Sequence, residues 1–224
     1  MVPEREPKME SVSTGFRASD VALCVIAPLA LAILEVFHPH VHDFLSLDLR
    51  VWLTIHYAQI PLFAVAGLAM AALVRTHTDL AATACRVAMF VFVVSYIPFD
   101  TTAGVVTGLL AQAAHASNAP GAWRPAINAV WNDPIFGGSP TASPPPVLAV
   151  LGTIAWSLGG LAAAVSLKRG GASMWPCLLL AISGFGLTIF RTHAWPGGPM
   201  TFAGLALAAA WILWNRRASK ALQQ

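Results

Sequence analysis

The chain has 224 residues, of which 57% are hydrophobic and only 10% are charged. Soluble domains carry about 25% charged residues, so this composition excludes a disordered chain and argues against a water-soluble enzyme. The net charge of +3 comes without a basic tract, and nothing indicates a nucleic-acid partner. The composition therefore predicts an all-α polytopic transmembrane bundle.

The chain divides into a single helical domain and two short tails. Residues 1–19 are polar and are expected to form a disordered cytoplasmic tail, and residues 216–224 form a second cytoplasmic tail. The transmembrane domain is expected over 20–215. About six of its segments are long and apolar enough to cross about 30 Å of hydrocarbon. These segments are approximately 20–38, 50–74, 86–110, 146–167, 173–191 and 199–215.

The third segment contains Pro98, which is expected to kink it. If the helix breaks there instead, the segment becomes two half-spans, and the orientation of every later segment is inverted. The sequence leaves both possibilities open.

The distribution of Lys and Arg predicts the orientation. With the N-terminus inside, ten of the 13 Lys and Arg residues lie on the inner side and three on the outer side. This bias predicts that both termini are cytoplasmic, in a membrane of the bacterial inner type. The loop at 116–145 then lies outside, either as a lid or docking surface or as a poorly ordered connector anchored by Trp123 and Trp131.

The polar residues of the spans gather at the outer end in this topology. His56 lies about 9 Å inward from the outer boundary and Asp100 about 21 Å from the inner one. Glu35 and His38 share a face in the last turn of the first span. Arg191 and His193 end the fifth segment and are also expected at this level.

Asp100 is the residue that most strongly indicates a site. A charged side chain within hydrocarbon costs about 2.5–3.5 kcal/mol on insertion scales, so Asp100 should face the bundle and meet a partner. Arg191, His56 and His193 are the expected partners.

This set of residue types predicts a metal-dependent membrane hydrolase acting on a lipid-like substrate. His38, His56 and His193 are the predicted ligands of a divalent metal such as zinc. Asp100 or Glu35 would act as general base. Arg191 would stabilise an oxyanion or a lipid phosphate.

Several alternatives stay open, including that the protein is not an enzyme. His56 and His193 could ligate a b-type haem, whereas no Cys-x-x-Cys-His sequence indicates covalent haem. Asp100, Glu35 and His56 could form a proton relay in a small transporter. Small residues at Gly160 and Ala164 suit close helix packing, which fits a homo-oligomer or an accessory subunit of a membrane complex. Histidines near span ends also occur simply as interfacial residues.

Overall fold

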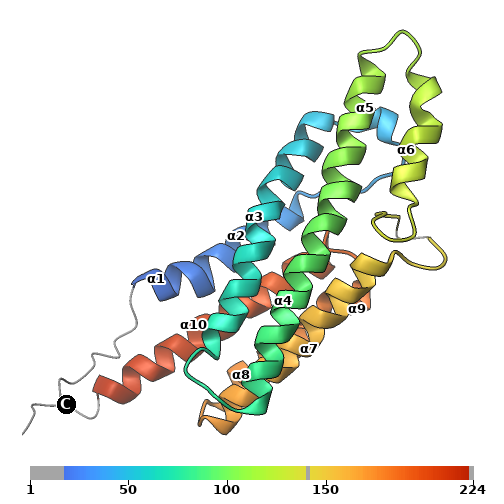
Figure 1. The fold of residues 1–224 in the computed structure, drawn as a ribbon. Coiled ribbons are helices and arrows are strands. Elements are labelled where there is room, and N and C mark those ends of the chain that lie inside the picture. The colour runs from blue at the N-terminus through green and yellow to red at the C-terminus, as the bar shows by residue number, and fades with distance from the viewer. Residues whose placement is uncertain (1–17, 140–141, 222–224) are drawn as a thin grey trace, which may run out of the picture.

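The computed structural model describes residues 18–139 and 142–221, and within these it is helical with no strand. Five helical segments are long and apolar enough to cross a membrane. They are Ala18–Val36, Leu49–Leu73, Leu80–His115, Val147–Arg169 and Gly197–Ala218. Figure 1 shows them side by side in one elongated bundle. The predicted helical membrane fold agrees with this. Of the predicted tail at 1–19, residues 1–17 lie outside the described residues, and Ala18 and Ser19 already belong to the first helix.

The first span is one helix with a wider turn inside it. It consists of α1 (Ala18–Val21), the π-helix η1 (Ala22–Ile26) and α2 (Ala27–Val36). It ends three residues before Pro39, whose ring cannot continue a helix.

Aspartates begin the next two helices. Asp48 caps α3 (Leu49–Leu73) by accepting hydrogen bonds from the backbone amides two and three residues further along the chain. Asp79 caps α4 (Leu80–Asp100) in the same way. A capping carboxylate satisfies amides that have no partner within the helix.

The third span is continuous through Pro98, which decides between the two possibilities that the sequence left open. Helix α4 passes into the π-helix η3 (Thr101–Val106) and then into α5 (Thr107–His115). These 36 residues extend about 54 Å, well beyond the roughly 30 Å of a hydrocarbon core. Helix α5 therefore stands out beyond the bundle (Figure 1).

The predicted fifth segment, 173–191, differs from the others. It forms two shorter helices, α8 (Met174–Ser183) and α9 (Gly186–Phe190), with a break between them. The hydroxyl of Ser157, on α7 (Val147–Arg169), bonds the carbonyl oxygen of Gly184 at this break, 2.9 Å away. The six-span count and the cytoplasmic termini thus stay predictions, beside five candidate spans in the structure.

The last helix, α10 (Gly197–Ala221), continues into residues expected to form the C-terminal tail. Aromatic side chains fill the core between the spans. Phe63, Phe92, Trp156 and Phe202 are all fully buried and pack edge to face or at a tilt.

The predicted outer loop, 116–145, is ordered where the structure describes it. The 3-10 helix η4 (Pro120–Trp123) and helix α6 (Arg124–Trp131) pack against α5 and against η2 (Phe44–Ser46). Ile127 is buried there, and the Arg124 guanidinium makes two hydrogen bonds, 2.8 and 2.9 Å, to the Asp43 carboxylate. We call η2, α5, η4 and α6 the cap.

Candidate metal centre

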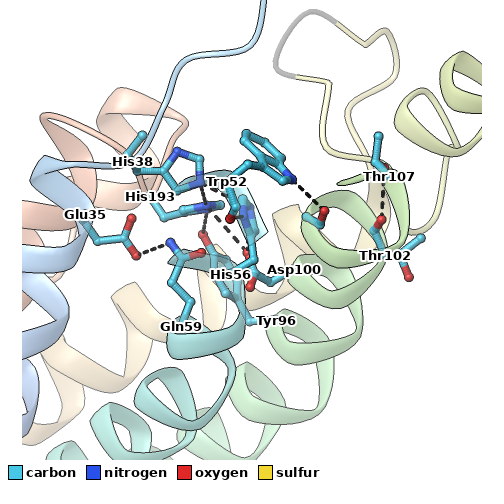
Figure 2. A network of polar contacts seen from close by, with 12 residues as sticks. Glu35, His38, Trp52, His56, Gln59, Tyr96, Asp100, Thr102, Thr107 and His193 are labelled. Carbon is cyan, nitrogen blue, oxygen red and sulfur yellow. Dashed lines mark hydrogen bonds and ion pairs between the residues drawn. The ribbon is translucent and has the colours of Figure 1, made fainter. Parts of the chain in front are cut away.

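Three histidines from separate parts of the chain meet at one point beneath the cap. His38 follows α2, His56 lies inside α3, and His193 lies between α9 and α10. The Nε2 atom of His38 is 3.3 Å from Nε2 of His56 and 3.2 Å from Nε2 of His193. Figure 2 shows the three rings pointing toward one another. The predicted ligand set is thus brought together.

The hydrogen bonds of His38 and His56 determine which ring nitrogen carries the proton. Nδ1 of His38 lies 2.9 Å from the carbonyl oxygen of Pro39, and Nδ1 of His56 lies 2.8 Å from that of Trp52. A carbonyl only accepts, so Nδ1 is the protonated nitrogen in both rings. In a neutral imidazole Nε2 is then a bare acceptor. Two such acceptors facing each other at 3.3 Å cannot hydrogen-bond; an electron-pair acceptor between them would stabilise both.

His193 can adopt the same pattern. Its Nδ1 lies 3.2 Å from the Tyr96 hydroxyl, which can accept a hydrogen bond and leave Nε2 unprotonated. Burial lowers the pKa of His38 to about 3 and also lowers the pKa of His193, so both rings are neutral at pH 7. Metal-ligating histidines commonly bond through the other ring nitrogen in this way.

The spacing of the Nε2 atoms fits a tetrahedral ion. Zinc binds histidine nitrogen at about 2.0–2.1 Å, which makes the edge of a regular tetrahedron about 3.3–3.4 Å. The two Nε2 separations of 3.3 and 3.2 Å match that edge. The ligand atoms of all three histidines lie within 4.8 Å of one another, so a small divalent cation fits two of the three edges as they stand and would need the third edge, His56 to His193, to adjust.

Asp100 lies beside the three histidines. Its side chain is fully buried, with Oδ1 3.7 Å from Nε2 of His193 and 4.0 Å from Nε2 of His56. Neither of its carboxylate oxygens has a hydrogen-bond partner among the described residues. A buried carboxylate without donors is strongly destabilised unless a cation or a proton compensates it.

Glu35 is a second buried acid next to this cluster. It is fully buried, and its Oε1 accepts a 2.8 Å hydrogen bond from Nε2 of Gln59. Glu35 Oε2 and Gln59 Oε1 have no partner in the described part of the chain. Glu35 thus lies near the histidines but bonds to Gln59, as Figure 2 shows.

Arg191 is placed differently from the other predicted residues. It is exposed, with a left-handed backbone (φ 52°), and the described contacts do not bring its guanidinium to the histidines. His40 and His42 are also exposed, so only the first histidine of the 38–42 segment joins the cluster.

Three further residues shape the site and were not predicted as part of it. Tyr96 bonds His193, Trp52 accepts the bond from His56, and Gly104 lies against the His56 ring. The spacing of Trp52 and His56, four residues apart on one helix, is the sequence signal that could have indicated one of them.

The haem alternative does not fit this geometry. The ring of His38 lies 4.9 Å from that of His56 and 4.8 Å from that of His193, centroid to centroid. A porphyrin between His56 and His193 would need the space that the His38 imidazole fills.

Comparison with known proteins gives no further guide to the site. No protein-family model, no curated protein and no solved structure matches the chain. The functional argument therefore depends on the geometry of the site itself.

Proposed function

We propose that this protein is a metal-dependent membrane enzyme in which His38, His56 and His193 hold one divalent cation of the zinc type. The observation that supports it is the convergence of three Nε2 atoms whose opposite ring nitrogens already have hydrogen-bond partners. Catalytic zinc sites use three protein ligands and keep one position for water or substrate.

The proposed reaction is hydrolysis, with Asp100 as general base. A cation held by the histidines would bring the pKa of a bound water close to neutrality. Asp100 accepts one proton of that water while the water oxygen bonds to the substrate carbonyl carbon. When the C–O or C–N bond of the substrate breaks, Asp100 returns the proton to the leaving group. Glu35, fully buried and bonded to Gln59, is the alternative general base beside Asp100, and exposed Arg191 takes no part in these steps.

The proposed substrate is lipid-like, with an ester or amide group near its polar end. His38 and His193 are the two partly exposed ligands, whereas His56 is buried. Exposed Phe37 precedes His38, and exposed Trp195 follows His193 by two residues. Aromatic side chains of this kind suit the boundary between hydrocarbon and water. An amphiphile in that boundary would bring its carbonyl group toward the histidines.

Metal content and turnover, measured on one preparation, test the proposal. The protein is purified in detergent without a histidine tag, and its metals are counted by mass spectrometry. We expect one equivalent of zinc, its loss in His56→Ala, and zinc-restored hydrolysis of fluorogenic long-chain acyl esters or amides. A wild-type protein that holds no stoichiometric metal after zinc addition would overturn the proposal.

A transporter is the second candidate. It is favoured by the break between α8 and α9 and by the buried oxygens of Glu35, Gln59 and Asp100 that have no described partner. Proton or zinc flux into proteoliposomes, without any hydrolytic product, would support it instead. The bacterial-type inner membrane, the lipid partner and a homo-oligomer or larger membrane complex are parts of the proposal that cell fractionation and co-purification can test.

A further inference from the structure

Trp52 occupies an unusual position between the candidate ligands. It lies on α3, one turn before His56, and is 1% exposed. Its ring centroid is 4.1 Å from that of His56 and 5.4 Å from that of His38. One indole thus touches two of the three histidines.

Trp52 also makes hydrogen bonds through both its backbone and its side chain. Its carbonyl oxygen accepts the hydrogen bond from Nδ1 of His56, 2.8 Å away. Its indole Nε1–H donates a 2.7 Å hydrogen bond to the carbonyl oxygen of Gly104, in η3. That carbonyl lies four residues after Asp100 in the chain. Trp52 therefore ties the helix that carries His56 to the helix that carries Asp100.

Gly104 allows this approach. A Cβ atom built on Gly104 would overlap the ring of His56, so α3 and η3 meet here at backbone distance. The Gly104 carbonyl, which also accepts from the backbone N–H of Thr107, thus bonds both its own helix and the Trp52 indole. The short separation between His56 and Asp100 depends on this contact.

We propose that Trp52 is a positioning residue that sets the orientation of the His56 ring relative to His38 and thereby the metal affinity of the site. This inference rests on the proposed metal centre. Trp52 does not touch the cation; it acts through the two helices and through the ring orientation of His56. Outer-shell groups of this kind change metal affinity without being ligands.

Two tryptophan substitutions form a matched test on the full chain in detergent micelles. Trp52→Phe keeps an aromatic ring and removes the bond to Gly104. Trp156→Phe is the control, because Trp156 is equally buried and its Nε1 has no hydrogen-bond partner among the described residues. Dissociation constants for Zn²⁺ are measured by competition with a chromogenic chelator, and Co²⁺ absorption reports the coordination geometry.

We expect the Zn²⁺ dissociation constant to rise about 10-fold in Trp52→Phe, the lower end for outer-shell changes because the carbonyl that bonds His56 is kept, with a shifted Co²⁺ spectrum. It should change less than about twofold in Trp156→Phe, whose side chain packs away from the ligands. If wild type binds one ion and Trp52→Phe binds it equally well, the positioning role is wrong and the metal centre stands. If wild type binds neither ion, the proposed centre is wrong and Trp52 has nothing to position.

If Trp52→Phe does not fold, hydrogen exchange in the wild-type protein tests the same proposal. Indole N–H signals of 15N-tryptophan protein are followed for exchange with deuterium. We expect slow exchange at Trp52, identified by its relaxation near Co²⁺, with further slowing on Zn²⁺ addition. Exchange as fast as that of exposed Trp175 in both states would overturn the proposal.

Discussion

The two ends of the bundle both contain buried polar side chains, but only at one end do these side chains satisfy one another. At the end opposite the cap, His77, Asp79 and Ser166 meet between α3, α4 and α7. The Ser166 hydroxyl donates to Oδ2 of Asp79 over 2.7 Å and accepts from Nδ1 of His77 over 3.1 Å. The other oxygen of Asp79 accepts from the first amides of α4. Donors and acceptors alternate, and no ligand is needed.

At the histidine end, hydrogen-bond acceptors face one another with no donor between them among the described residues. Nε2 atoms of His38 and His56 point at each other, and the Asp100 carboxylate lies beside them without a described donor. Histidine and aspartate occur at both ends, so the residue types alone do not separate a structural cluster from a ligand site. The balance of donors and acceptors does.

The largest expected difference between the two ends is in metal binding. We expect His193→Ala to weaken Zn²⁺ binding by more than about 100-fold, the upper end for losing an outer-shell partner. His77→Ala, at the opposite end, should leave the affinity unchanged, because the His77 side chain bonds Ser166 and lies near Asp79. Chelator competition measures both variants. Equal losses of Zn²⁺ affinity in His193→Ala and His77→Ala would contradict the proposed difference between the two ends.

An effect of comparable size is expected for the aspartates on turnover. Asp100→Asn should lower the hydrolytic rate by about 10²–10⁴-fold, the usual contribution of a general base. One equivalent of zinc should stay bound by the three histidines. Asp79→Asn provides the comparison and should leave the rate unchanged. Full activity in Asp100→Asn would remove Asp100 from the mechanism.

Packing at the histidine end should tolerate added side-chain atoms poorly. We expect Gly104→Ala to lower the free energy of unfolding by about 1–3 kcal/mol, the usual cost of overpacking. The added Cβ would overlap the His56 ring, which its hydrogen bond to the Trp52 carbonyl keeps in place. Gly121→Ala, in the cap, has nothing within 4 Å and should change stability by less than about 0.5 kcal/mol. Thermal unfolding in detergent compares them. A Gly104→Ala protein as stable as wild type would mean that α3 and η3 separate easily.

At the opposite end a single hydroxyl should have a purely structural effect. Ser166→Ala removes a fully buried partner of both His77 and Asp79 and should destabilise the fold by about 1 kcal/mol. Zinc affinity should be unaffected. A change in affinity would show that the two ends are coupled.

The smallest expected effect is at the cap surface. The hydrogen-bonded Arg124 guanidinium holds the pKa of Asp43 below its ordinary value. A lowered folded-state pKa means that the pair contributes stability above the ordinary carboxyl pKa and loses it as the pH falls through the lowered one. Tryptophan fluorescence below about pH 4 should therefore report loosening of the cap in wild type. In Arg124→Gln this pH dependence should be weaker; an identical profile would show that the pair has no role.

Much of the site could be predicted because hydrocarbon makes polar residues conspicuous. His56 and Asp100 were placed at the same depth from helical rise alone, and the structure brings them within 4.0 Å. His38 and His193 followed from their places at span ends. Arg191 was expected there for the same reason, but its left-handed backbone turns the chain and leaves it exposed.

Other features depend on contacts between distant segments and could not be predicted from local pattern. The helix continues through Pro98 and only then enters a π-helical turn, which has no sequence signal of its own. The break at Gly184 is bonded by Ser157, from another helix. Helix α6 is short and buries Ile127 only because α5 extends beyond the bundle to meet it.

The π-helix η3 restricts how this sequence can diverge during evolution. A wider turn is equivalent to one residue inserted into an α-helix, and each residue of an α-helix turns the following chain by about 100°. Deleting one residue between Thr101 and Val106 would therefore rotate α5 relative to Asp100 and take Gly104 away from Trp52. Substitutions on the outer surface of α5 leave that alignment intact. Related chains that keep this site should accordingly conserve the number of residues between Asp100 and the cap more strictly than their identities.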